Sequence, residues 1–232
     1  MRVLVTGASR GLGLEFSRQY LQAGDRVFAS ARNPDESTGV RELLSAFPDR
    51  AMAVECDVAD DASVEAAAHL VAESAPDLDL VLNNAGTYGR HDETLGSLDW
   101  DEVREVLEVN TLGPLRVARA FLPLLKKGKN PKLIQITSLM GSIDDNRSGG
   151  AWSYRMSKAA LNMASRNLAH ELGRSGIISL VIHSGWVKTD MGGAGAPLEI
   201  EEAVASMVKT IAKLTSKQSG AFLDRHGKPQ PW

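Results

Sequence analysis

Short apolar runs alternate with longer amphipathic stretches along the whole chain. The apolar runs are almost continuously hydrophobic, which is typical of strands that are covered on both faces. The stretches between them have the apolar spacing of helices that bury one side. This alternation predicts an α/β fold, in which helices are wound on both faces of a parallel sheet. We expect strands at residues 3–5, 27–30, 51–55, 78–82, 132–137 and 177–182, and helices at 11–22, 39–46, 62–74, 100–125, 152–173 and 199–214.

Several residues refine this prediction. Asp61 is placed to cap the helix that follows it. Pro114 falls inside the segment 100–125, so we expect a break or kink in that helix. The glycine-rich segment 192–197 predicts a mobile loop. No linker or repeat divides the chain, and we therefore expect a single domain over residues 1–232.

Composition narrows the class of protein. The chain has 232 residues, with 26 Lys and Arg against 29 Asp and Glu, which gives a formal net charge of −3. This balance disfavours nucleic acid as a partner, and no apolar run is long enough to cross a membrane. Cys56 is the only cysteine and the five histidines lack metal-binding spacing, so we expect neither a disulfide nor a metal site. Because no signal peptide precedes the first strand, we expect a cytoplasmic protein.

The first strand is followed by a glycine-rich turn that opens a helix. In this context, backbone N–H groups and the positive end of the helix meet a pyrophosphate. Gly7 permits the tight exit from the strand, Gly11 the close approach of the ligand, and Gly13 the close packing of the helix. Glycines alone are weak evidence, but the flanking strand and helix are what a dinucleotide site requires. We therefore expect cofactor contacts from Gly7, Ser9, Arg10, Gly11, Leu12 and Gly13.

The residue after the second strand indicates which dinucleotide binds. An Asp or Glu there would hold the ribose 2′-hydroxyl of NAD, whereas a basic residue suits the 2′-phosphate of NADP. Arg32 occupies this position, and Arg10 could reach the same phosphate, so the charge favours NADP(H). Asp57 and Val58 follow the third strand. Asp57 could accept a hydrogen bond from the adenine amino group, or could serve only as a turn residue.

Candidate catalytic residues follow the fifth strand and open the next helix. Ser138 stands at the carboxyl end of the strand, and Tyr154 and Lys158 lie on one face of the helix. Reduction of a carbonyl needs a proton donor beside the hydride donor, and a free tyrosine, with a pKa of about 10, exchanges its proton poorly at neutral pH. We expect the Lys158 cation, together with oxidised nicotinamide, to lower the pKa of Tyr154. Ser138 would hydrogen-bond the substrate oxygen.

These motifs together resemble the short-chain dehydrogenase/reductase family, whose fold is a single Rossmann-type domain. The glycine spacing of the first turn, the sequence Asn-Asn-Ala-Gly at residues 83–86 and the Tyr–Lys pair match the family over essentially the whole chain. Ser184 departs from the pattern, because the family has proline there. Within the family, the segments 140–144 and 185–193 are similar to the C-factor and sniffer-type carbonyl reductases, which use NADPH.

The resemblance implies roles for further residues. Asn110 matches the family's fourth catalytic residue, which stabilises a helix kink and holds a water that links the lysine to solvent. It could also be a polar residue of the helix interior. The family's usual contact helices imply a homodimer or homotetramer. The remaining cofactor contacts that the family implies are Asn84, Ala85, Gly86, Tyr154, Lys158, Gly185, Val187 and Thr189.

Three functions fit these residues. The leading hypothesis is an NADPH-dependent reductase of a small ketone or aldehyde, with Tyr154 as the proton donor. The reverse reaction, alcohol oxidation with NAD, is disfavoured by Arg32. The third is a cofactor-binding redox sensor or signalling protein with slow turnover, which a complete Ser–Tyr–Lys set does not exclude. The sequence does not specify the substrate, although Trp152, Trp186 and Tyr88 favour an apolar or aromatic one if they are not packing residues.

Overall fold

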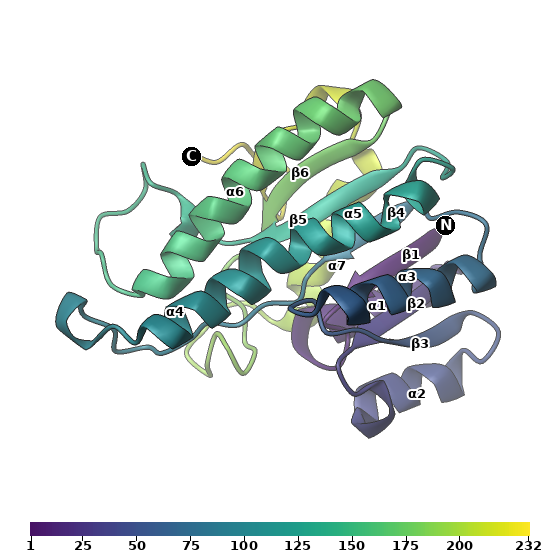
Figure 1. The fold of residues 1–232 in the computed structure, drawn as a ribbon, viewed down its shortest axis with the longest axis horizontal. Coiled ribbons are helices and arrows are strands. Elements are labelled where there is room, and N and C mark those ends of the chain that lie inside the picture. Colours follow the sequence, from purple (N-terminus) through teal and green to yellow (C-terminus); the bar gives the residue numbers. More distant parts are fainter.

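Seven parallel strands form one sheet through the middle of the molecule (Figure 1). The computed structural model describes residues 1–232. In the sheet the strands stand in the order β3-β2-β1-β4-β5-β6-β7. The direction of strand addition reverses between β1 and β4, and in such a sheet ligands bind outside the carboxyl ends of the strands at that point. The bounds are β1 (Arg2–Thr6), β2 (Arg26–Ala31), β3 (Ala51–Glu55), β4 (Leu80–Asn83), β5 (Lys132–Thr137), β6 (Ile178–His183) and β7 (Phe222–Asp224).

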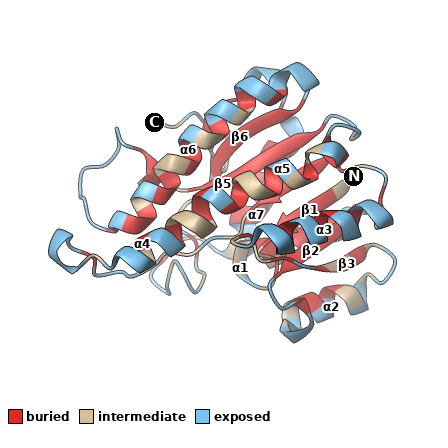
Figure 2. Cartoon of the chain, viewed as in Figure 1, coloured by how far each residue is buried: buried red, intermediate tan, exposed pale blue.

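Helices cover both faces of the sheet, and alternate strand residues supply the two cores. Val3 and Val5 of β1 belong to the core under the first set of helices, whereas Leu4 between them belongs to the core under the second. The strands are mostly buried and the helices expose their outer sides (Figure 2). The doubly wound prediction is therefore confirmed. The first set is α1 (Gly11–Gln22), α2 (Thr38–Ala46) and α7 (Ile200–Lys213), and the second is α3 (Asp61–Ser74), α4 (Trp100–Leu107), α5 (Gly113–Leu125) and α6 (Trp152–Leu172).

Most boundaries differ from the sequence prediction by one or two residues, and hydrogen bonds account for two of these differences. Helix α3 begins one residue earlier than expected, because Asp60, not Asp61, is its cap: the Asp60 carboxylate accepts hydrogen bonds from the backbone N–H groups of Ala62 and Ser63. Strand β4 begins two residues later than expected. The amide of Leu78 donates to the carbonyl of Leu124 in α5 instead of to a neighbouring strand.

The predicted break in segment 100–125 is present, and it takes the form of a π-helical turn over Glu108–Leu112. Asn110 lies in this turn, and Pro114 follows it in the first turn of α5, where the missing N–H has no intrahelical partner to lose. π-Helical turns are rare and occur often at functional sites. The break therefore coincides with a candidate catalytic residue.

The segment 192–197 is a braced turn, where the sequence predicts a mobile loop. Gly192 donates its N–H to Thr189 Oγ1 (3.0 Å) and accepts from the indole Nε1 of Trp186 (2.8 Å). A parallel bridge between Val187 and Leu198 closes the base of the turn. Gly192 serves close packing, since a Cβ on it would lie 2.0 Å from the carbonyl oxygen of Val187.

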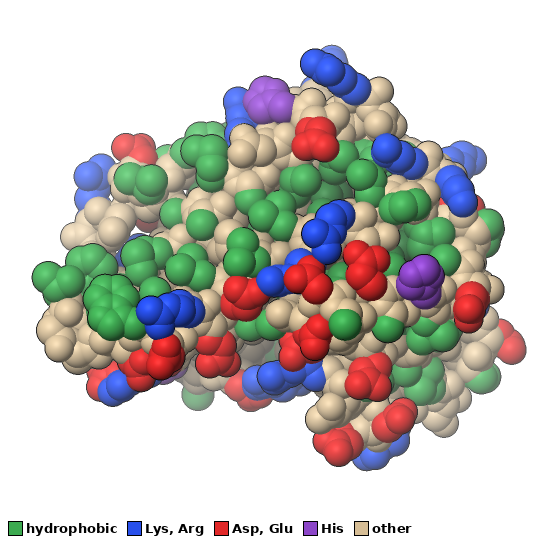
Figure 3. Space-filling view, in the orientation of Figure 1, with side chains coloured by type: hydrophobic (Ala, Val, Ile, Leu, Met, Phe, Trp, Pro, Cys, Tyr) green, Lys and Arg blue, Asp and Glu red, His purple; other side chains and the backbone are tan.

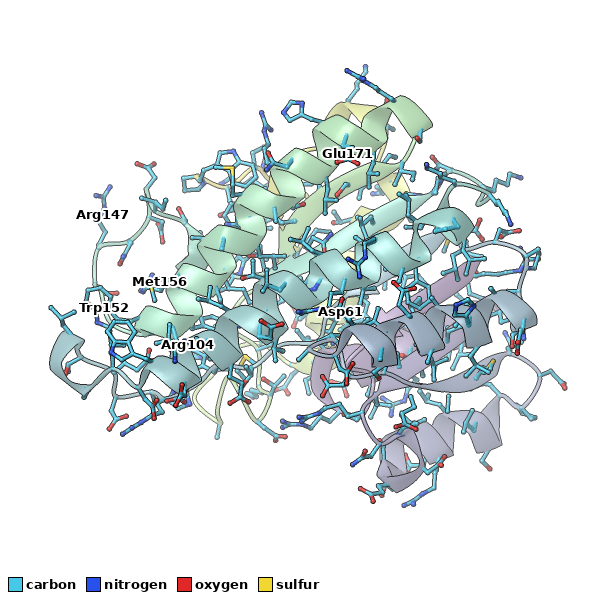
Figure 4. The ribbon with its side chains drawn as sticks, in the orientation of Figure 1. Asp61, Arg104, Arg147, Trp152, Met156 and Glu171 are labelled. Carbon is cyan, nitrogen blue, oxygen red and sulfur yellow. The ribbon has the colours of Figure 1, made fainter.

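The outer surface of α4 to α6 carries exposed apolar side chains. Figure 3 shows hydrophobic side chains gathered over this part of the molecule, with acidic and basic side chains mixed around them. Trp152 and Met156 lie at the start of α6, beside the loop that carries Arg147 (Figure 4). No helix combines the length and the apolar character needed to span a bilayer. The exposed apolar residues on this surface are Trp100, Leu112, Trp152, Met156 and Met163.

Candidate active site

The phosphate-binding turn between β1 and α1 is shaped by its glycines. Gly7 has a φ of +67°, and a Cβ on it would lie 2.8 Å from the Cα of Ala85. A Cβ on Gly13 would lie 2.2 Å from the carbonyl oxygen of Gly7. No side chain caps the first turn of α1, so its N–H groups remain available to an anion. The turn therefore fits a pyrophosphate.

The Asn-Asn-Ala-Gly segment joins this turn to the sheet. The Asn84 amide donates to the carbonyl oxygens of Thr6 (2.9 Å) and Gly7 (3.3 Å), so this side chain points back to the turn. Asn83 donates to Gln135 Oε1 of β5 at 2.7 Å. Thr6 Oγ1 accepts from the backbone N–H groups of Asn84 and Ala85, both at 3.0 Å. Thr6 was not predicted as a site residue, although its place directly before Gly7 is a usable signal.

A polar cavity of about 430 Å³ opens at the carboxyl ends of β2 and β3. Its acidic side chains are acceptors that suit an amino group, such as that of adenine, and Arg32 is its only cation. One oxygen of Asp57 already accepts from the N–H of Ala59, which is the turn role that the sequence left open. Arg10 is exposed and forms an ion pair with Asp190 of the loop after β6. The cavity is lined by Arg32, Asn33, Glu55, Asp57, Asp60 and Ser63.

The loop after β6 faces the phosphate turn. A Cβ built on Gly11 would lie 3.6 Å from Thr189 Cγ2, so the two predicted cofactor segments border one cleft. Val187 is buried, and Gly185 has a φ of +89° that favours glycine. The side chain of Val58, which was also predicted as a cofactor contact, does not border this loop; it is buried against Gly113 at the start of α5.

Ser138, Tyr154 and Lys158 converge where β5 meets α6. The Ser138 side chain lies close enough to the Tyr154 hydroxyl to lower its pKa. Lys158 Nζ lies 5.7 Å from the centre of the Tyr154 ring and donates to the carbonyl oxygen of Ile136 in β5 at 3.1 Å. Both Tyr154 and Lys158 are buried, at 8% and 5% exposed. The predicted catalytic group is therefore assembled in the structure.

The predicted lowering of the Tyr154 pKa concerns Lys158 acting together with oxidised nicotinamide, and the fold by itself shifts this pKa upward. Burial raises it to about 12, and the nearby Ser138 side chain opposes that rise only in part. Burial also lowers the pKa of Lys158 to about 8, so this cation is itself weakened. The sequence suggested the attraction of the lysine charge, but the larger effect is desolvation of the buried phenol.

Asn110 holds the loop after β4 against α6. Its Oδ1 accepts from the backbone N–H of Thr87 (2.8 Å), and its Nδ2 donates to the carbonyl of Thr87 (2.7 Å) and to Ser157 Oγ (3.0 Å). Asn110 is completely buried. A Cβ on Gly86 would lie 3.1 Å from Asn110 Oδ1 and 3.6 Å from Lys158 Nζ, so Asn110 stands close to Lys158.

Further residues at the site have no signal in a sequence motif. The Tyr88 ring stacks on Tyr154 with centroids 4.6 Å apart, and His91 stacks on the ring of Tyr88 at 4.3 Å. The buried carboxylate of Glu93 accepts from the backbone N–H of Ser153 at 2.9 Å and from the Ser153 hydroxyl. Glu93 thus caps the helix that carries the catalytic pair, which favours that helix electrostatically.

The single cysteine, Cys56, is buried. Burial raises the pKa of the Cys56 thiol to about 11, so it is not an activated nucleophile. No three His, Cys, Asp or Glu side chains gather in a way that could hold a metal ion.

A dinucleotide cleft with an adjoining Ser–Tyr–Lys group defines an oxidoreductase of the Rossmann class. The family model for short chain dehydrogenases matches residues 1–197, and the chain belongs to this family. It is 38% identical over 234 residues to 1-hydroxy-2-glutathionyl-2-methyl-3-butene dehydrogenase of Rhodococcus sp. (strain AD45), covering 99% of each chain. It is 43% identical over 155 residues to the C-signal protein of Myxococcus xanthus, covering 67% of this chain and 93% of that one.

Solved carbonyl reductases share the complete fold. The NADPH-bound carbonyl reductase from chicken fatty liver superposes with a TM-score of 0.93 at 39% identity, covering 100% of this chain and 98% of that chain. The carbonyl reductase Sniffer of D. melanogaster superposes with a TM-score of 0.95 at 31% identity, covering 100% and 99%. The resemblance predicted from the motifs is therefore confirmed.

Proposed function

We propose that this protein is an NADPH-dependent carbonyl reductase that acts on small ketones or aldehydes. The observation that carries the proposal is the convergence of Ser138, Tyr154 and Lys158 at the edge of a glycine-lined cleft. The two solved relatives named carbonyl reductases support the substrate class, and the NADPH in the chicken enzyme supports the cofactor.

The chain's own residues would bind the cofactor and would supply the proton for the carbonyl oxygen. The phosphate turn holds the pyrophosphate, Arg32 holds the 2′-phosphate, and the loop at Val187 and Thr189 faces the nicotinamide end of the cleft. Bound NADPH would supply the hydride. Ser138 orients the carbonyl oxygen and Tyr154 gives that oxygen its proton.

The test measures binding of NADPH and NADH, and then the loss of reduced-cofactor absorbance with ketones, aldehydes, quinones and a glutathionyl aldehyde. We expect tighter binding of NADPH and turnover with some of these carbonyls. Tyr154→Phe should reduce kcat at least about 100-fold, since general acid catalysis contributes roughly that much. Tyr20→Phe is the matched control, because the Tyr20 hydroxyl is buried without a partner. Absence of turnover with any carbonyl would refute the proposal.

A signalling function is the second candidate, and the specific observation that favours it is the 43% identity to C-signal. Both functions can reside in one chain. Tyr154→Phe in the native host separates them, because a role that depends on catalysis is lost and a role that depends on cofactor binding alone is kept.

For assembly, we infer a homodimer through the exposed apolar side chains of α4 to α6, which size-exclusion chromatography with light scattering would test.

A further inference from the structure

His183 ends strand β6, and its side chain joins two loops at the edge of the candidate active site. Its Nδ1 lies 3.3 Å from the backbone N of Leu139 and 3.3 Å from the backbone N of Gly185. Leu139 directly follows Ser138, and Gly185 begins the loop that continues to Thr189. A single ring nitrogen therefore contacts the exits of both β5 and β6.

This geometry specifies the chemical state of the imidazole. A nitrogen that accepts hydrogen bonds carries no proton, so the ring is neutral with its proton on Nε2. The charged groups that face it are Asp224 on β7, Arg225, and Asp145 in the loop beyond Leu139. The two carboxylates favour the charged ring, but burial and Arg225 lower the pKa of His183 below its ordinary value.

The backbone N–H groups of Leu139 and Gly185 have no second acceptor that holds them as His183 does. Leu139 opens a short 3-10 helix, whose first N–H groups have no acceptor within the helix. The hydroxyl of Ser138 accepts from the next amide, that of Met140, at 3.1 Å. At the other loop, Ser184 precedes Gly185 and leaves its own φ free, where a proline would fix it. The His183 imidazole therefore restrains the backbone at both Leu139 and Gly185.

We propose that neutral His183 is a positioning residue, which holds the turn of Ser138 and the loop of Gly185 together by accepting both backbone N–H groups at Nδ1. The inference rests on the proposed function, because it concerns the alignment of the oxygen-binding serine with the nicotinamide-facing loop. His183 touches neither reacting atom and takes no proton from the substrate. Its effect is on geometry, where small displacements change rates strongly.

The kinetic test compares His183→Leu with His183→Asn. Leucine has a similar size and no acceptor, whereas the Asn Oδ1 occupies about the place of the imidazole Nδ1. We expect His183→Leu to lower kcat about 10- to 100-fold, the range that corresponds to leaving buried donors unpaired. His183→Asn should restore kcat to within about 5-fold of wild type, and His69→Leu, on the exposed side of α3, should change nothing. Equal kcat losses in the Leu and Asn variants, or no loss in either, would overturn the proposal.

A second measurement does not depend on activity or on how the variants fold. A long-range ¹H–¹⁵N correlation spectrum of the wild-type protein at pH 7 should show His183 with Nδ1 bare and Nε2 protonated. A proton on Nδ1 would overturn the proposal whether or not any carbonyl is reduced. If the spectrum is as expected and no carbonyl is reduced, the proposed function fails while the bridging role of His183 stands.

Discussion

Replacing Asn110 with alanine removes the side chain that connects the π-helical turn to two other parts of the site. Three hydrogen bonds are lost, to the N–H and C=O of Thr87 and to Ser157 Oγ. At about 1 kcal/mol for each bond, with a further contribution from the void, we expect Asn110→Ala to reduce the free energy of unfolding by about 3–4 kcal/mol. For a chain of this size, that lowers Tm by about 6–16 °C.

The assay is thermal unfolding followed by circular dichroism, with kcat measured on the same samples. Asn167→Ala is the matched control, because Asn167 is exposed on α6 and should change stability by less than about 0.5 kcal/mol. We also expect kcat to fall, since Thr87 leads into the loop whose Tyr88 stacks on Tyr154. A Tm for Asn110→Ala within about 2 °C of wild type would refute the reasoning that these bonds hold the loop.

Two further predictions concern charged side chains at the cleft. Burial lowers the pKa of Lys158 to about 8, below its ordinary value of 10.5, so the unfolded chain binds more protons between these values and stability rises with pH through that window. Lys158→Met should therefore raise Tm at pH 7 and lose activity, and the gain in Tm should shrink by pH 10; an unchanged Tm at pH 7 would contradict this. Asp190→Asn frees Arg10 from an exposed ion pair and should tighten NADPH binding by about 2- to 5-fold without affecting NADH. Titration of both nucleotides checks this, and equal tightening of NADH would show that the 2′-phosphate is not involved.

Sequence patterns placed the residues whose function depends on local chain geometry. Ser138 could be assigned because it directly follows a strand whose carboxyl end lies at the ligand edge, and Gly13 because the flanking strand and helix set its environment. The break near Pro114 was predicted, but its π-helical form depends on Asn110 bonding to Thr87 of another segment. In each case, the features that could be predicted are those that depend on residues close together in the chain.

Contacts between distant segments could not be predicted, because no local pattern encodes them. Glu93 caps α6 across a separation of 60 residues, and His183 reaches Leu139 across 44. The segment 192–197 reads as a mobile loop from its glycines, yet Gly192 is required for a close contact with Val187. Likewise, the pKa of Tyr154 follows from how completely the fold buries it, which the spacing of Tyr and Lys does not reveal.

The raised pKa of Tyr154 bears on the direction of the reaction. A proton donor must carry its proton when a carbonyl binds, and a phenol with a pKa of about 12 does so at any neutral pH. A base for alcohol oxidation must instead be a phenolate, which the buried side chain disfavours until another positive charge joins Lys158. Because burial weakens the Lys158 cation as well, the protein alone prepares the acid and not the base. The side chains of the protein alone therefore favour the protonated form of Tyr154, which the proposed reduction requires.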